Sequence, residues 1–249
     1  MPWQLPQVGD SASAIPALRQ ALMPAVEAQA LARLARDPQL ARRLQQFTQA
    51  LEKAPDLKAA LRDPRVLGVL LPALGLADAV GQPGLALRAL TSDPKDPKGL
   101  LARLGDRRWK AAAETLNLAT RGLAGLRDPK VQAALADGLR RLTWQQGMDA
   151  EQPGISDALD FRSRASRAKT AYDVLGDPVL RRVVTTALGL PQQLALQSVE
   201  AQARTLGSRF DLAKLQNPRE VAKLAERYVV MAAGSAADAA PVGVLALFA

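Results

Sequence analysis

Apolar residues recur along this chain three or four positions apart, which is the spacing of one face of an α-helix. Most of these runs follow an Asp-Pro or Asn-Pro pair. Aspartate or asparagine can accept a first-turn N–H, and proline at the first helical position gives up no hydrogen bond, so each pair is typical of a helix start. No Asn-Gly or Asp-Gly pair separates two β-rich runs. The sequence therefore predicts an all-α, multi-helix protein.

This punctuation also predicts where the helices lie. They are expected at residues 15–35, 38–53, 56–62, 64–74, 83–91, 97–104, 106–116, 129–146, 155–174, 178–188, 198–209 and 218–232. Gly75 and Gly189 follow the last apolar residues of their helices, where a left-handed C-terminal cap needs glycine. Pro72 falls inside its helix, so a kink or an early end is expected near Leu71.

One stretch of the pattern occurs twice. Residues 61–76 (LRDPRVLGVLLPALGL) and 175–190 (LGDPVLRRVVTTALGL) align without a gap at an offset of 114. Further on, the stretch at 100–109 resembles the one at 221–230, where Leu101, Ala102 and Leu104 pair with Val221, Ala222 and Leu224 at an offset of 120. We therefore expect two pseudo-repeated helical units that superpose, around 61–116 and 175–231, joined by a long helix.

Changes in composition divide the chain. We expect a flexible N-terminal arm, a first helical half, a polar linker, a second helical half and an apolar C-terminal tail. Their ranges are 1–14, 15–146, 147–154, 155–233 and 234–249. The N-terminal residues lack a charged start followed by an apolar block, and no run reaches the roughly 18 apolar residues of a membrane span. A cleaved signal and a transmembrane segment are therefore not expected.

Composition narrows the possible chemistry. The chain of 249 residues contains no Cys and no His, which removes disulfides, thiolate nucleophiles, imidazole bases and most zinc, copper and haem ligation. Ser166 and Lys169 match a Ser-x-x-Lys spacing, but the partner motifs of that chemistry are missing. Asp157 and Asp160 are more simply first-turn acids. No phosphate-binding glycine loop is present. We predict no catalytic residues, no metal site and no cofactor.

The net charge of +9 raises an anionic partner as a possibility, although windows of sixty residues show the excess spread thinly. The densest basic cluster consists of Arg162, Arg164, Arg167 and Lys169, with no acid between them. On one helix these positions spread around more than half the circumference. A charged face paired with nearby acids is the simpler interpretation, and a nucleic-acid-binding regulator is the alternative.

The C-terminal tail is the second candidate for partner binding. It ends in apolar residues that include Val244, Leu245, Leu247 and Phe248. An apolar segment of this kind either packs on its own domain or inserts into a partner groove, and both remain open.

Several segments resemble one bacterial protein family. They are ALDFRSRASRAKTAYDVLGDPVLRRVVTTALGLPQQLA at 158–195, VEAQARTLGSRFDLAKLQNP at 199–218 and LAERYV at 224–229, with similar stretches over 37–118. The family is of unknown function and chiefly alphaproteobacterial. Its members are encoded in flagellar gene clusters and often described as flagellar or flagellar basal-body proteins. The resemblance implies an all-helical accessory or assembly protein and carries over no catalytic residues.

These observations together predict the function. We expect a non-enzymatic, flagellum-associated structural, assembly or interaction protein, cytoplasmic or at the flagellum, that acts through helical surfaces and the tail. Its partner is expected to be a flagellar or other protein, and nucleic acid is the less favoured partner.

Overall fold

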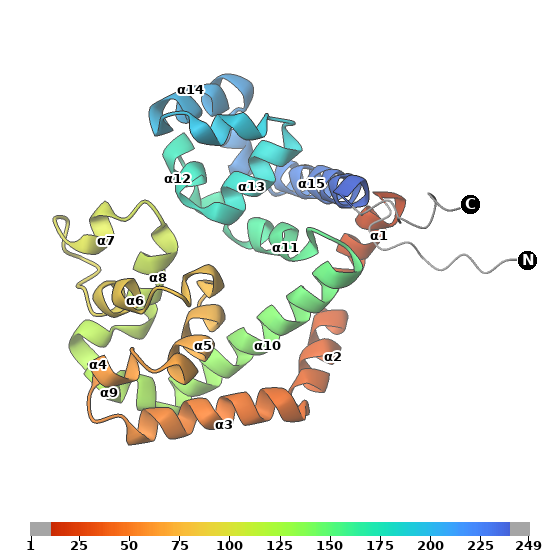
Figure 1. Ribbon diagram of the computed structural model, residues 1–249. Coiled ribbons are helices and arrows are strands. Elements are labelled where there is room, and N and C mark those ends of the chain that lie inside the picture. Colours follow the sequence, from red (N-terminus) through yellow and green to blue (C-terminus); the bar gives the residue numbers. More distant parts are fainter. Residues whose placement is uncertain (1–10, 240–249) are drawn as a thin grey trace, which may run out of the picture. The chain divides into compact units, whose positions relative to one another are not determined.

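The computed structural model describes residues 11–239, and all regular structure in that range is helical (Figure 1). The predicted all-α class is confirmed. The chain divides into two compact units, one formed by Met1–Val26 with Gln145–Ala249 and the other by Glu27–Trp144. We refer to them as the outer unit and the inner unit, after their places in the sequence.

The inner unit is built from short helices around one apolar core. Its helices are α3 (Pro38–Lys53), α4 (Leu57–Ala60), α5 (Pro64–Ala73), η1 (Ala77–Ala79), α6 (Pro83–Leu90), α7 (Leu100–Arg103), α8 (Arg107–Leu116) and α9 (Leu118–Arg127). Helix α2 (Pro24–Leu34) enters this unit and α10 (Pro129–Glu151) leaves it. Helix α3 packs on α5, and α6 packs on α8. Phe47, Leu70 and Leu116 are almost fully buried in this core.

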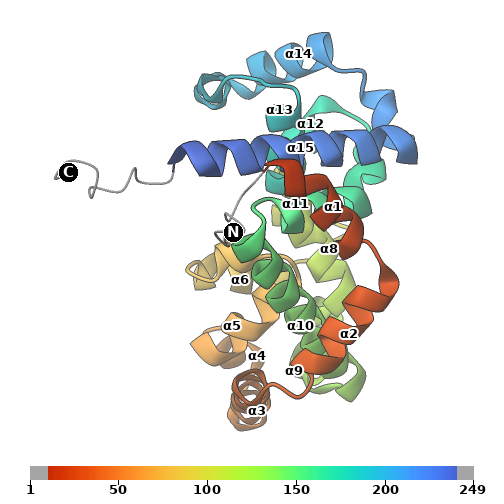
Figure 2. The ribbon, with the colours of Figure 1, turned by 90° about the vertical axis from the view of Figure 1, so that its right-hand side faces the viewer.

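The outer unit combines the first helix with the last ones. It contains α1 (Ser11–Ala21), α11 (Ile155–Arg164), η2 (Ala165–Arg167), α12 (Ala171–Gly176), α13 (Pro178–Ala187), η3 (Gln192–Leu196), α14 (Val199–Arg209), η4 (Leu212–Gln216) and α15 (Pro218–Ala239). Helix α1 packs along α15 and α11, as Figure 2 shows for α1 and α15. Arg19 pairs with Glu226 across that contact, at 3.1 Å.

Most predicted helix starts are confirmed by their caps. The Asp37 carboxylate accepts the Leu40 N–H at 2.8 Å, and Asp177 accepts the N–H groups of Val179 and Leu180. In each case proline occupies the first helical turn. These caps depend only on neighbouring residues, which explains why the sequence pattern places them well.

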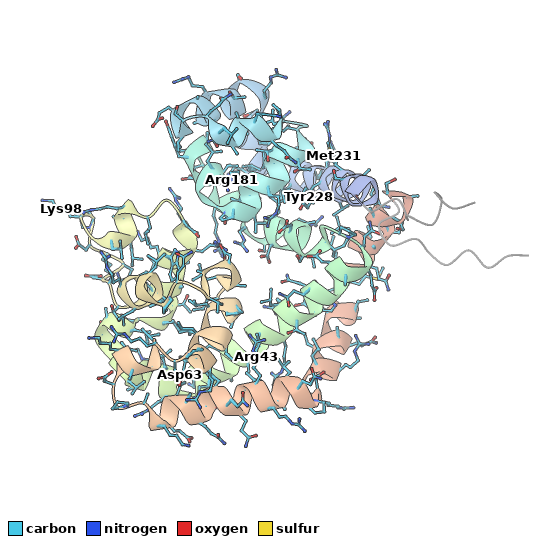
Figure 3. The ribbon with its side chains drawn as sticks, viewed as in Figure 1. Arg43, Asp63, Lys98, Arg181, Tyr228 and Met231 are labelled. Atoms are coloured by element: carbon cyan, nitrogen blue, oxygen red, sulfur yellow. The ribbon has the colours of Figure 1, made fainter. Side chains whose placement is uncertain are left out.

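Pro72 does not end its helix early, contrary to expectation. Helix α5 continues to Ala73, with Pro72 in its last turn. Proline has no N–H to donate to the Gly68 carbonyl one turn earlier. The Arg43 side chain of α3, labelled in Figure 3, donates to that carbonyl instead. A packing contact from the neighbouring helix thus replaces the hydrogen bond that proline removes.

The repeated stretches have matching helix ends. After α5, Gly75 has φ +75°, and the Leu76 N–H bonds the Leu71 carbonyl. After α13, Gly189 has φ +65°, and the Leu190 N–H bonds the Thr185 carbonyl. Both are six-residue loops of the Schellman type, which need a left-handed residue.

The order of elements is similar in the two units. The series α3, α4, α5, η1, α6, α7, α8 corresponds to α11, α12, α13, η3, α14, η4, α15, with η2 as an extra turn between α11 and α12. In this order the short turns LLARLGD at 100–106 and DLAKLQN at 211–217 each precede a capped helix, at an offset of 111. The pairing at an offset of 120 stays a prediction. That the two units superpose stays a prediction.

Other expectations were wrong at sites where a local break or continuation was not recognised. The expected helix 15–35 is broken before Pro24, and 155–174 is broken where Thr170 and Asp173 form a capping box that starts α12. Helix α9 was missed. Residues 147–151 of the expected linker belong to α10, and α15 runs seven residues past its expected end at 232. Residues 11–14 of the expected arm are helical, while 1–10 lie outside the described residues.

Candidate functional site

The four cations of the predicted basic cluster do not act together. The Arg164 side chain is largely buried and pairs with Asp160 and Asp177, with 3.2 Å to the latter. Lys169 donates to the side-chain oxygen of Gln216. Arg162 and Arg167 are exposed. Arg164 therefore ties α11 to the start of α13, and the other three cations remain exposed. Nucleic-acid binding by this cluster stays a prediction.

The other predicted partner-binding residues cannot be placed. Val244, Leu245, Leu247 and Phe248 lie outside the described residues. Ser166 lies in η2, and Lys169 follows that short turn rather than continuing the same helix. The hydroxyl and the amine are therefore not one α-helical turn apart, as Ser-Lys chemistry would need.

A polar cluster that the sequence reasoning did not identify as a unit joins three helices of the outer unit. Asp157 of α11 pairs with Arg182 of α13, with 2.8 Å from Arg182 Nη2 to Asp157 Oδ1. The Tyr228 hydroxyl of α15, labelled in Figure 3, donates to Asp157 Oδ2 at 2.7 Å. Charge-assisted hydrogen bonds of this kind are among the stronger polar contacts in proteins. One carboxylate thus holds α11, α13 and α15 together.

A second carboxylate lies beside this cluster at the junction of α10 and α11. Asp149 accepts hydrogen bonds from the backbone N–H of Ser156, at 2.9 Å, and from the Ser156 hydroxyl. Gly154, with φ +89°, makes the turn between the two helices. A Cβ at Gly154 would lie 2.9 Å from Ala232 Cβ and 3.0 Å from Tyr228 Cε1. The turn therefore approaches α15 as closely as glycine allows.

The electrostatics of this cluster favour a structural role. Burial and the neighbouring Asp157 carboxylate raise the pKa of Tyr228 far above its usual range. The hydrogen bond to Asp157 raises the pKa of Arg182 against the opposing effect of burial. Neither group loses its proton near neutral pH, so neither serves as a general base there. Within residues 11–239, no group of three or more Asp or Glu side chains could hold a metal ion.

Asp149 predicts a specific pH dependence of stability. Burial raises the pKa of Asp149 above its ordinary value of 3.8, an effect that the Ser156 hydrogen bonds only partly oppose. A raised folded-state pKa means that stability falls as pH rises from the unfolded pKa through the folded one. We expect Asp149→Asn, which cannot ionise, to gain stability relative to the natural protein over that rise. Urea unfolding of both proteins, from about pH 3.5 to pH 7, measures the difference. A difference that does not change with pH would contradict the assignment.

Large apolar side chains are exposed on η3, α12 and α14 of the outer unit. Leu196, at the end of η3, is 88% exposed, and Val199, in the first turn of α14, is 51% exposed. Tyr172 of α12 is 55% exposed, and α12 packs on α14. Exposed apolar side chains on neighbouring helical elements are candidates for contact with a partner. We call Tyr172, Leu196 and Val199 the apolar surface.

Only part of these features has a signal in the sequence. Asp157 and Asp160 were recognised as first-turn acids, but the partners of Asp157 lie far along the chain, Arg182 at 25 residues and Tyr228 at 71. The run QQLALQSV at 192–199 looks like the start of another apolar helix. Its exposure follows from the 3₁₀ turn of η3, which buries only Leu194. No helix within residues 11–239 is both long and apolar enough to cross a membrane.

Comparisons with known proteins give the family and a protein of similar fold. A family model described as "Protein of unknown function (DUF1217)" matches residues 73–221, which is more than half of the chain. The chain is also similar to an Agrobacterium tumefaciens protein whose X-ray structure was a structural-genomics target. The TM-score is 0.70 at 22% identity, covering 93% of this chain and 96% of that one. At that identity the likeness shows the fold alone. No curated protein matches the chain.

Proposed function

The chain belongs to the DUF1217 family of proteins of unknown function, and from this premise we propose that it is a non-enzymatic interaction or assembly protein associated with the flagellum. In this proposal it works in the cytoplasm or at the flagellum and binds a protein partner through helical surfaces. The apolar surface carries the proposal, because Tyr172 and Val199 are exposed on α12 and α14, which pack on each other, and Leu196 is exposed on η3, which precedes α14.

The polar chemistry of the described residues supports binding rather than catalysis. Asp157, Arg164 and Arg182 are each engaged in contacts between helices of the same unit. A catalytic group needs to contact a substrate, whereas these groups form ion pairs with side chains of the same unit. The chain also lacks the histidine and cysteine side chains on which much acid–base and covalent catalysis depends.

The flagellar setting comes from the sequence resemblance. The segments at 158–195 and 199–218 carry it, and they include α12 and α14 with Tyr172 and Val199, while Leu196 lies between the two segments. Proteins that assemble with others often cover such surfaces on binding, with apolar anchors supplying most of the affinity. The partner proposed here is accordingly a protein of the flagellum.

Replacing Leu196 and Val199 together by aspartate tests this proposal. Two carboxylates would have to lose water on binding, so capture of the partner from native cells is expected to fall about tenfold or more. Swimming in soft agar by cells that carry only the variant is expected to fall as well.

The matched control is Gln193→Asp with Gln197→Asp, which adds the same charge at exposed positions of the same segment without removing apolar area. It should leave partner capture and swimming near the natural level. Normal swimming and normal capture by the Leu196→Asp, Val199→Asp protein would contradict the proposal, provided its helical circular dichroism is unchanged.

A further inference from the structure

The positive charge of this protein is concentrated in one structural unit. Residues 27–144 contain 20 of the 33 Lys and Arg residues and 12 of the 24 Asp and Glu residues. The inner unit therefore carries a net charge of +8 out of the chain's +9. Equal windows along the sequence hide this difference because the outer unit is assembled from both ends of the chain. The field of the inner unit favours an anionic partner.

Most acidic side chains of the inner unit accept hydrogen bonds from backbone N–H groups of the same unit. The side chains that accept helix-start or turn N–H groups are those of Asp37, Asp56, Asp63, Asp93, Asp96, Asp106 and Asp128. Several of these carboxylates and most of the others also pair with an arginine of the same unit, as Asp63 does with Arg65 and Glu27 with Arg141. They stabilise helix starts and neutralise few of the exposed cations. The unpaired charge at its surface is therefore positive.

Two of these cations line a hollow between the end of α2 and the start of α3. The hollow has a volume of about 590 Å³ and is open to solvent. Its lining residues are Gln29, Ala32, Arg33, Leu34, Arg36 and Asp37. The Arg33 and Arg36 side chains are exposed and form no ion pair or hydrogen bond with any residue of 11–239. The Asp37 carboxylate, by contrast, already accepts the Leu40 N–H.

We propose that this hollow binds an acidic segment of a partner protein, with the Arg33 and Arg36 guanidinium groups holding its carboxylates. Guanidinium pairs with carboxylate through two parallel hydrogen bonds, and Gln29 adds an amide that both donates and accepts. The inference rests on the proposed function, since it takes the partner to be a protein. It adds the chemistry of that partner and a second contact site, on the inner unit.

The surroundings of the hollow favour an acidic protein over a nucleic acid. Single-stranded nucleic acids bind through bases stacked on exposed aromatic rings. The aromatic residues of the inner unit are Phe47, Trp109 and Trp144, and all three are buried. A duplex needs a row of phosphate contacts over an extended surface, whereas Arg33 and Arg36 lie together in one hollow that also holds the Asp37 carboxylate.

Binding of fluorescent poly-L-glutamate to the full-length protein at low salt tests this inference. We expect the natural protein to bind it and the Arg33→Ala, Arg36→Ala variant to bind about tenfold more weakly. The matched control is Arg162→Ala with Arg167→Ala, which removes two exposed, unpaired cations from the outer unit. The control should bind within about twofold of the natural protein, because its two cations lie outside the hollow. Both variants lose the same charge, so a difference between them is not an effect of net charge.

Any of the following results would contradict the inference. No binding by the natural protein, or equal weakening by both variants, would show that the hollow has no special role. Tighter binding of a fluorescent DNA duplex, lost in the Arg33→Ala, Arg36→Ala variant, would assign the hollow to nucleic acid instead. The Leu196→Asp, Val199→Asp variant keeps both arginines and is expected to bind poly-L-glutamate normally. Failure of this inference is therefore distinguishable from failure of the proposed function.

Discussion

Replacing Gly138 by alanine is expected to lower the free energy of unfolding of the inner unit by about 3 kcal/mol or more. Gly138 lies in α10, and a Cβ there would be 2.6 Å from the Ala73 carbonyl oxygen at the end of α5. Both groups belong to helix backbone, so neither can rotate away as a side chain would. The helices must separate, and the α5 core contacts made by Leu70 and Leu71 would loosen with them.

Gly147→Ala is the control for that prediction, since it lies in the same helix with nothing within 4 Å of its Cβ position. Alanine there should be neutral or stabilising by up to about 1 kcal/mol, because it favours helix. Urea unfolding followed by tryptophan fluorescence measures both variants through Trp109 and Trp144 of the inner unit. Equal stability of the two variants would contradict the close approach of α10 to α5.

Gly154→Ala is expected to destabilise the outer unit by about 3 kcal/mol, from two separate causes. A left-handed residue with a side chain costs about 1–2 kcal/mol, and forcing a methyl group into a filled space costs a further ~1–3 kcal/mol. The new methyl would press on Tyr228 and Ala232 and so displace α15 from Asp157. Hydrogen exchange of the α15 amides measures the local loss.

Gly189→Ala separates the two causes. Gly189 has φ +65°, but nothing lies within 4 Å of its Cβ position. That variant should show only the conformational cost, about 1–2 kcal/mol. If Gly154→Ala proved no more harmful than Gly189→Ala, the close contact between the α10–α11 turn and α15 would be refuted.

The helix starts were predictable because their causes are local. Asp37, Asp63 and Asp177 cap helices through N–H groups two or three residues away, and Gly75 and Gly189 close the ends of α5 and α13. Any chain with these residues in this order meets the same local preferences. The ends and starts of α5 and α13 therefore follow closely from the sequence.

Features that depend on tertiary context were not predictable in the same way. Asn117 takes a left-handed conformation, and α9 begins directly after it without a side-chain cap. The glycine at 147 indicated a linker, yet it lies within α10. The capping box of Thr170 and Asp173 has a recognisable sequence pattern, but apolar residues at helical spacing over 155–174 led to the prediction of one continuous helix.

The candidate binding sites show the same difference between local and tertiary causes. The clustering of Arg162, Arg164, Arg167 and Lys169 in the sequence does not make them a cluster in space, because Arg164 turns inward to Asp160 and Asp177. Conversely, the charge excess of residues 27–144 becomes visible only when the unit boundaries are known. Sequence order and spatial grouping differ most where a unit is assembled from distant segments.

The most direct test of a partner-binding role places a photocrosslinking amino acid at position 196 of the full-length protein in its native cells. Position 193, exposed on the same segment, is the matched control. We predict an adduct between position 196 and a protein of the flagellum, with little or none from position 193. Absence of any protein adduct at position 196, in cells that swim normally, would contradict the account.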